Sequence, residues 1–489
     1  MHIGSHAPPR LRGWRGAVAS RGITGDGGQD MLSDGASVTP AGPDIPARAT
    51  ERALMSRLLR RGASGAFIVS TVGTALGLLA NLVMARLIGR AEYGIYALMF
   101  SWVSVLVMVA QAGQDISIIR FLPGYIQDHA WGKVRGLRIG VGFFVLATSI
   151  CVAIAGCVVV HVIGANHSAS WRATFYIGFA MLPILTQLQQ SSAMHRAFKR
   201  PVVTGMYSTV MRPVALLVLL GIAWAIAVPR DAPTAAMCTA LAGLIALLAS
   251  GWHLTRAWPA PGRGARAGYE ARRWITVGWQ LSLLSIITVG GARLDVMLLG
   301  AIMGTGDVGP YYAAVKMAGF AFFATQAVNV VLAPLIAERY DARDMHGLQS
   351  VAVQGARIGL AGALCVALFC AVAGRWLLGL FGHDFDTAYV PLLILLLGCC
   401  ASTCFGEVGF MLSMTKYQKQ ASIFVLVGIA ANCIAAVLLV PRLGATGAAI
   451  GASLSLFIWR GLAWRFVTTR LGIEPSVFGS LERDAGTRP

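Results

Sequence analysis

About a dozen apolar stretches of nearly constant length follow one another between Ser64 and Thr468, separated by short loops. A helix needs ~20 apolar residues to cross the hydrocarbon core of a bilayer, and the chain supplies that length repeatedly. In a bilayer each backbone polar group must be satisfied within its own segment, so these stretches are expected to be helices. The pattern therefore predicts an all-α polytopic membrane protein with about 12 transmembrane helices.

The composition agrees, with 56% hydrophobic and 12% charged residues and a mean hydropathy of +0.67. The nine cysteines lie almost wholly inside apolar stretches, where cysteine acts as a small hydrophobe, so neither a disulfide nor a metal site is expected. The predicted spans are 64–85, 93–114, 138–162, 172–192, 204–227, 235–253, 275–302, 309–336, 353–373, 389–412, 421–440 and 446–467.

The loops alternate between arginine-rich and arginine-poor. The even-numbered loops carry seventeen Lys and Arg residues and the odd-numbered loops six. The positive-inside rule therefore predicts a multi-pass protein of the cell (inner) membrane with both termini in the cytoplasm. The net charge of +19 is explained by this bias and by attraction to anionic headgroups, so no nucleic-acid partner is expected.

The chain divides into five segments. Residues 1–60 are rich in Gly, Pro, Ser, Ala and Arg and are predicted to be a disordered cytoplasmic tail, in which Met31 and Met55 are alternative start residues. Residues 61–258 form a predicted N-lobe of six spans. Residues 259–273 form a cytoplasmic linker, residues 274–470 a C-lobe of six spans, and residues 471–489 a second cytoplasmic tail.

An internal repeat supports this division. Residues 88–97 recur in looser form as residues 303–312, and both copies join the first two spans of their lobe. The halves are thus predicted to be parallel, pseudo-symmetric lobes around a central cavity, which work by rocking between two access states. The alternative is that both copies are only tight turns at helix ends. The aligned pairs are Gly89 with Gly304, Glu92 with Asp307, Gly94 with Gly309, and Tyr96 with Tyr311.

Several segments resemble the polysaccharide transporter family, within the superfamily of multidrug/toxin exporters and oligosaccharide-lipid flippases. Residues 86–96 look like its first-loop signature, and the order of the other similar segments carries the specificity. The resemblance implies a two-lobed bundle that moves lipid-linked sugars from the inner to the outer leaflet. The other similar segments are 118–123, 293–300, 380–385 and 445–452.

Charged residues inside the predicted spans are the first candidates for a substrate site, because burying a charge in lipid is costly. Span seven carries Arg293 and Asp295, and span eight carries Lys316 at a similar expected depth. We expect an Asp295–Lys316 ion pair with Arg293 nearby, which leaves net positive charge in the cavity. The alternative is an ion pair within one lobe that only fixes helix packing.

Arg212 stands near the middle of span five and is followed by Pro213, which can kink the helix. A guanidinium group matches phosphate oxygens in a bidentate manner, so Arg212 is a candidate for binding the diphosphate of a lipid-linked oligosaccharide. Snorkelling toward the cytoplasmic interface is the competing interpretation.

Four further polar residues complete the candidates. Glu407 in span ten could take part in ion coupling, since burial raises the pKa of a carboxyl group. Arg120 lies in the loop at the inner end of span two, where an interfacial position competes with a gate. Gln280 and Asn329 either line the cavity or form hydrogen bonds between helices.

These features favour a flippase that exports lipid-linked oligosaccharide (polyprenyl-diphosphate sugar) for polysaccharide biosynthesis, performs no covalent chemistry and needs no cofactor. Its expected partners are this anionic substrate, membrane lipid and polysaccharide assembly proteins. A cation-coupled multidrug or toxin antiporter is the alternative within the superfamily, although the spans favour Arg and Lys over acidic residues.

A membrane enzyme of polysaccharide assembly is the third alternative. It would need a sizeable catalytic outer loop. The longest one, about Gly374 to Val390, carries His383, Asp384 and Asp386 but no set of nucleophile, base and orienting residue.

Overall fold

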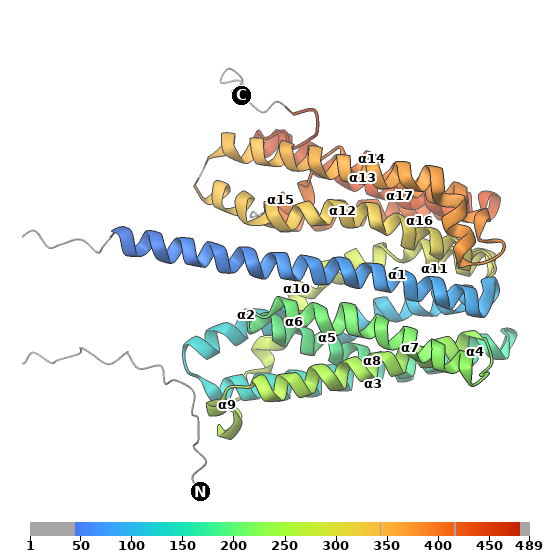
Figure 1. The fold of residues 1–489 in the computed structure, drawn as a ribbon, viewed down its shortest axis with the longest axis horizontal. Helices are drawn as coiled ribbons and strands as arrows, with labels where there is room; N and C mark the ends of the chain where they lie inside the picture. The colour runs from blue at the N-terminus through green and yellow to red at the C-terminus, as the bar shows by residue number, and fades with distance from the viewer. Residues whose placement is uncertain (1–44, 343, 415–416, 480–489) are drawn as a thin grey trace, which may run out of the picture. The chain divides into compact units, whose positions relative to one another are not determined.

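The predicted spans all correspond to helices in the computed structural model, which describes residues 45–342, 344–414 and 417–479. The chain divides into two units, Met1–Ser56 and Arg57–Pro489. The described helices are α1 (Ile45–Gln111), α2 (Gln114–Gln127), α3 (Trp131–Ile163), η1 (Gly164–Asn166), α4 (Ala169–Ala180), α5 (Leu182–Ala197), α6 (Pro201–Gly205), η2 (Met206–Met211), α7 (Arg212–Ala225), α8 (Ala232–Ala257), α9 (Ala260–Gly264), α10 (Ala271–Gly291), α11 (Leu294–Met303), α12 (Val308–Asp341), α13 (Met345–Phe381), η3 (Phe385–Ala388), α14 (Tyr389–Thr403), α15 (Val408–Met414), α16 (Gln418–Leu443) and α17 (Ala445–Leu471) (Figure 1).

The described residues contain no β-strand, which confirms the predicted all-α fold class. Seven described helical segments are long and apolar enough to cross a membrane by themselves. One of them, Gly65–Gln111, contains the first two predicted spans. Spans four and seven are each broken into two shorter helices, α4 with α5 and α10 with α11.

The predicted N-terminal tail differs in part from the structure. The prediction for residues 1–44 lies outside the described residues, but disorder was expected through residue 60 and helix α1 begins at Ile45. Residues 47–60 are rich in Ala, Arg, Leu, Met and Glu, which are strong helix formers. The helix that contains the first span therefore begins on the N-terminal side of the apolar stretch, because these residues favour helix.

The internal repeat is visible in the backbone. Gly89 and Gly304 occupy equivalent positions, and their φ/ψ angles are 79°/174° and 77°/−170°. An L-residue with a side chain rarely adopts this conformation, so glycine is required at both turns. We call the end of the bundle that carries these two turns the turn end, and the opposite end, which carries residues 259–270, the linker end.

The two copies of the repeat pack against each other at the turn end. A Cβ atom on Gly94 would lie 2.0 Å from the carbonyl oxygen of Thr305. A Cβ atom on Gly309 would lie 2.5 Å from the carbonyl oxygen of Arg90. Arg90 and Thr305 are themselves equivalent in the repeat, so the contact is reciprocal, as a pseudo-twofold relation requires.

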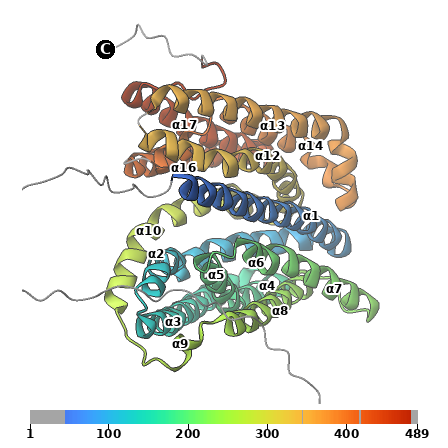
Figure 2. The same ribbon diagram turned by 60° about the vertical axis from the view of Figure 1, so that its left-hand side comes forward.

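Helix α10 bridges the two halves of the chain. It contacts α2 and α3 of the first half (Figure 2) and also α16 of the second half, whereas α11, which follows it, contacts α12, α16 and α17. A Cβ atom on Gly113 would lie 2.1 Å from the carbonyl oxygen of Gly278. Two glycines therefore let the backbones of α10 and the first half meet closely nearer the linker end.

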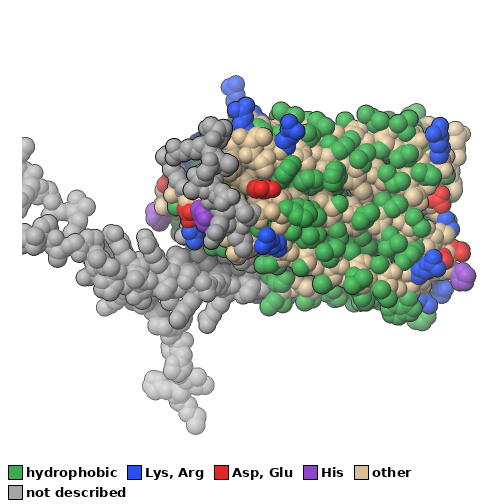
Figure 3. Space-filling model, turned by 90° about the horizontal axis from the view of Figure 1, so that it is seen from above, with side chains coloured by type: hydrophobic (Ala, Val, Ile, Leu, Met, Phe, Trp, Pro, Cys, Tyr) green, Lys and Arg blue, Asp and Glu red, His purple; other side chains and the backbone are tan. Residues whose placement is uncertain are grey.

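The surface of the described part is that of a membrane protein. In the view of Figure 3, hydrophobic side chains cover the middle of the face, and charged side chains gather toward its two ends. Large apolar side chains such as Phe143, Leu248, Leu368 and Val372 are more than half exposed. Exposed apolar surface on this scale needs lipid as its solvent, so the chain is a multi-pass membrane protein.

Candidate functional site

Arg212 begins helix α7, directly after the π-helical turn η2. π-Helical turns occur often at functional sites. This one lies just before Pro213, which has no backbone N–H to donate. A Cβ atom on Gly73 of α1 would lie 2.6 Å from the carbonyl oxygen of Thr209 in this turn. Helix α1 therefore packs closely on the irregular turn that sets the position of Arg212.

Arg293 lies at the break between α10 and α11 and is the N-terminal cap residue of α11. Gly290 and Gly291 end α10 just before it. Its side chain is partly buried and close enough to Asp295 for the two charges to interact. The break places this cation between α10, which contacts α2 and α3 of the first half as well as α16, and α11, which contacts α12, α16 and α17.

Asp295 is paired with Tyr311 rather than with Lys316. The Tyr311 hydroxyl donates a hydrogen bond of 2.6 Å to Oδ2 of Asp295, and the Val296 N–H donates one of 2.8 Å to Oδ1. Among the described ion pairs there is none between Asp295 and Lys316. The expected pair is thus wrong, because the buried Tyr311 of α12 and the backbone N–H of Val296 already donate to the carboxylate.

Cations of both halves interact electrostatically with Tyr312. The side chains of Arg212, Arg293 and Lys316 all lie within electrostatic range of the Tyr312 phenol. The ammonium of Lys316 lies 4.8 Å from the centre of the Tyr312 ring. The guanidinium of Arg212 lies 5.5 Å from the centre of the Phe100 ring. All three cations are partly buried, and Arg212 and Lys316 each lie near an aromatic ring, so positive charge is concentrated near Tyr312.

The other predicted residues lie away from this cluster or outside the description. Arg120 on α2 and Gln280 on α10 are both exposed, on helices that contact each other. The side chain of Asn329 lies outside the residues whose side chains the structure describes. Whether these residues touch a substrate stays a prediction.

Glu407 belongs to a second buried polar cluster with Arg460. Glu407 is 8% exposed and Arg460 4% exposed, and both lie within electrostatic range of Cys399. Nη1 of Arg460 donates a hydrogen bond of 3.3 Å to the carbonyl oxygen of Ser402. Sequence reasoning missed Arg460, although the rule that identified Arg212, a charge inside an apolar span, applies equally to it.

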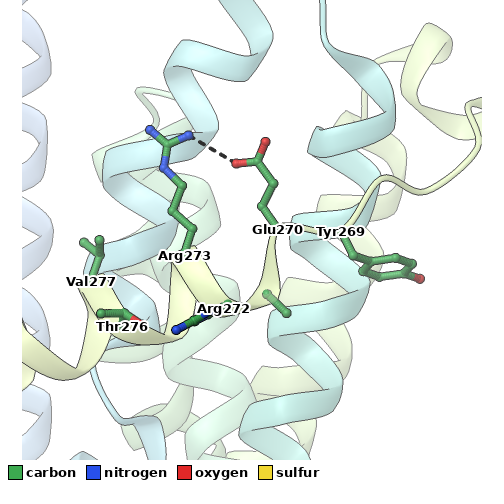
Figure 4. Close-up of a pocket in the computed structure, with 7 residues that line it drawn as sticks. Tyr269, Glu270, Arg272, Arg273, Thr276 and Val277 are labelled. Carbon is green, nitrogen blue, oxygen red and sulfur yellow. Dashed lines mark hydrogen bonds and ion pairs between the residues drawn. The ribbon is translucent and has the colours of Figure 1, made fainter.

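The linker end carries an ionic clamp centred on Glu270. Its carboxylate accepts hydrogen bonds from Lys133 at 2.6 Å, from the Tyr125 hydroxyl at 2.9 Å and from Arg273 at 3.2 Å. The hydrogen bond from Lys133 is the largest influence that lowers the pKa of Glu270 below its ordinary value of 4.5. A cavity of about 550 Å³ lies beside this clamp (Figure 4), and the clamp ties the linker to α2 and α3.

The fold defines a multi-pass helical membrane protein with its internal repeat packed across the two halves. Residues 59–339, more than half of the chain, match the model of the family described as "Polysaccharide biosynthesis protein". The chain belongs to this family. It is also similar to the "Uncharacterized membrane protein EpsK" of Bacillus subtilis (strain 168), with 26% identity over 221 residues. That match covers 44% of this chain and less than half, 42%, of EpsK.

Solved structures share the fold. A multidrug resistance MATE family transporter of the MOP superfamily, in an inward-facing conformation, aligns with a TM-score of 0.68 and 12% identity over 84% of this chain and 98% of its own. The lipid II flippase MurJ, in an inward closed conformation, aligns with a TM-score of 0.63 and 12% identity over 82% of this chain and 87% of its own. A MOP superfamily transporter from Pyrococcus furiosus aligns with a TM-score of 0.63 and 12% identity, over 85% of this chain and 96% of its own.

Proposed function

We propose that this protein is a flippase that moves a lipid-linked oligosaccharide, carried on polyprenyl diphosphate, across the inner membrane by alternating access. The observation that carries the proposal is the gathering of Arg212 from the first half and of Arg293 and Lys316 from the second half around Tyr312. Membership of the polysaccharide biosynthesis family supports it. So does the fold shared with a protein described as a lipid II flippase.

The charge of the cluster suits a diphosphate. Three cations and one carboxylate, Asp295, meet there among the described residues, and the carboxylate already accepts two hydrogen bonds. The guanidinium groups can bind phosphate oxygens in a bidentate manner, whereas Lys316 offers a point charge. In this proposal the sugar crosses in the hydrated space next to these cations, and the polyprenyl chain stays in lipid.

The repeat contact supplies a way for the two halves to move. The halves meet at the turn end through Gly94 and Gly309, and nearer the linker end through Gly113 and Gly278. At the turn end these backbone contacts lie within a core shared by both halves, in which Tyr93 packs against Tyr312 and Phe385. Both contacts are formed in this structure, and in this proposal alternating access opens one of them at a time.

Translocation in proteoliposomes tests the proposal. The purified protein would be reconstituted with a labelled polyprenyl-diphosphate oligosaccharide, and exposure of the sugar to a membrane-impermeant glycosidase would be followed over time. We expect Arg212→Ala to slow translocation by about tenfold or more, because a charge-assisted hydrogen bond is worth ~1.5–3 kcal/mol. Arg212→Lys should retain part of the rate. Full translocation by well-folded Arg212→Ala would refute the substrate role.

A cation-coupled multidrug antiporter is the second candidate, favoured by the fold shared with MATE transporters and by the buried carboxylate of Glu407. The same vesicles distinguish the two candidates. Uptake of a cationic dye that depends on an ion gradient and is lost in Glu407→Gln would support the antiporter. Sugar translocation without such a gradient supports the flippase.

A further inference from the structure

A cavity of about 660 Å³ lies at the linker end, between the start of α3, the end of α8 and α9. This volume is in the ordinary range for small-molecule sites. Its helices belong to the first half of the chain, and neither Arg212 nor Tyr312 lines it. We call it the arginine pocket; it is lined by Arg135, Arg138, Ile139, Thr255, Arg256, Trp258, Gly262 and Arg263.

The pocket concentrates positive charge. Four of its eight lining residues are arginines, and among the described residues that line it there is no carboxylate. Unpaired arginines repel one another, so a pocket of this kind is stabilised when an anion enters it. An arginine-lined cavity beside a membrane span is a typical place for the headgroup of an acidic lipid.

The guanidinium groups are held in place without losing their charge. Arg138 lies over the buried Trp258 ring, 4.6 Å from its centre. Nη1 of Arg135 donates a hydrogen bond of 2.9 Å to the carbonyl oxygen of Ala265. Nη2 of Arg263 donates one of 3.1 Å to the carbonyl oxygen of Thr255. Each guanidinium keeps further N–H donors for an anion, because an arginine carries five.

Exposed apolar side chains lead away from the pocket along α3 and α8. Ile139, which lines the pocket, is 44% exposed, and Phe143, one turn further along α3, is 74% exposed. On α8, Leu248 and Trp252 are 63% and 60% exposed, and the Arg256 guanidinium lies 3.8 Å from the centre of the Trp252 ring. This apolar surface suits acyl chains, whereas a free phosphate ion would have no use for it.

We propose that the arginine pocket binds the phosphate group of an anionic membrane phospholipid, whose acyl chains lie along Phe143, Leu248 and Trp252. The arginines clamp the phosphate oxygens, and the exposed Trp252 sits at the boundary between headgroup and chains, where tryptophan is favoured. This site is separate from the cation cluster around Tyr312, so it stands whether or not the protein translocates sugar lipids.

Native mass spectrometry of the purified full-length chain tests the proposal. The probes are phosphatidylglycerol, zwitterionic phosphatidylcholine and inorganic pyrophosphate. The pocket variant is Arg138→Gln with Arg256→Gln. The matched control is Arg465→Gln with Arg470→Gln, which removes equal charge from exposed positions on α17 at the same end. Thermal unfolding of each variant establishes that it is folded, and Arg256→Gln alone repeats the test at an exposed residue.

We expect the wild type and the control to retain a tightly bound phosphatidylglycerol that survives activation, with phosphatidylcholine bound more weakly. The pocket variant should bind phosphatidylglycerol about tenfold or more weakly, since charge-assisted hydrogen bonds are lost. Equal losses in both variants, or equal binding of the two lipids by the wild type, would overturn the proposal. Displacement of the lipid by pyrophosphate would also overturn it and assign the pocket to a soluble phosphate.

Discussion

Arg90 and Asp307 form an ion pair of 2.8 Å between the two copies of the internal repeat. Nε of Arg90 also donates a hydrogen bond of 3.0 Å to the carbonyl oxygen of Gly306. Both charged side chains are about one-third exposed, so the pair is worth ~0.2–1 kcal/mol. The ion pair joins the first half of the chain to the second at the turn end.

Charge reversal tests this pair. Arg90→Glu alone and Asp307→Arg alone should each lower the melting temperature slightly, and the double variant should recover most of the loss, because opposite charges face each other again. Thermal unfolding of the purified proteins at low salt measures the coupling free energy. Additive losses in the double variant would show that the two residues do not interact in the membrane protein.

The reciprocal glycine contact makes a stronger prediction. Gly94→Ala or Gly309→Ala puts a methyl group onto a backbone carbonyl, which cannot move aside as a flexible side chain can. Overpacking of this kind costs ~1–3 kcal/mol, and the two substitutions should have similar effects because the contact is pseudo-symmetric. Gly221→Ala on α7 is the control, since nothing lies near its Cβ position. If the control destabilises as much as the other two, the close contact is not the cause.

Tyr311→Phe should expose the dependence of Asp295 on its tyrosine partner. Removing the hydroxyl leaves a buried carboxylate oxygen without that donor, which costs ~1–3 kcal/mol. Asp295→Asn should cost less, because a neutral amide is cheaper to bury. Tyr389→Phe serves as the control, since its hydroxyl donates 2.6 Å to the carbonyl oxygen of Ala371 and serves no carboxylate. Chemical or thermal unfolding would rank the three, and a harmless Tyr311→Phe would contradict the pairing.

The ionic clamp at Glu270 predicts a dependence on pH. Its pKa is lower in the folded protein than the ordinary 4.5, with the hydrogen bond from Lys133 as the main cause. The clamp therefore contributes stability in full above pH 4.5, and the contribution is lost as the pH falls through the folded pKa. The melting temperature of the wild type should exceed that of Glu270→Gln near neutral pH and approach it in acid. A constant difference across this range would exclude the clamp as the cause.

Much of the fold could be predicted because the bilayer leaves few choices. Apolar length fixes where helices cross, and the repeat around Gly89 and Gly304 required the same backbone turn twice. Helix α1 was extended by propensity that hydropathy does not measure. The break before Arg293 was not predicted either, because it depends on how α10 packs against α2 in a distant part of the sequence.

The sequence could indicate which charged residues belong to the candidate site, but not which residues they contact. The cost of a charge in an apolar span singled out Arg212, Arg293 and Lys316, which all lie within electrostatic range of Tyr312. That they bind a substrate stays a prediction. The ion pair between Asp295 and Lys316 was predicted only because the two residues have a similar expected depth in the membrane. The side-chain directions that place Tyr311 against Asp295 instead are not contained in spacing. Arg460 met the same criterion of a charge in a span and was overlooked.

The claim that one anion is held by cations from both halves can be measured most directly by a double-mutant cycle between Arg212 and Lys316. Sugar-lipid translocation would be measured for Arg212→Gln, Lys316→Gln and the double variant in the same vesicles. If both cations hold one diphosphate, each single variant is slow and the double variant is little slower than the worse of them. Effects that simply multiply, or a single variant with the wild-type rate, would contradict a shared site.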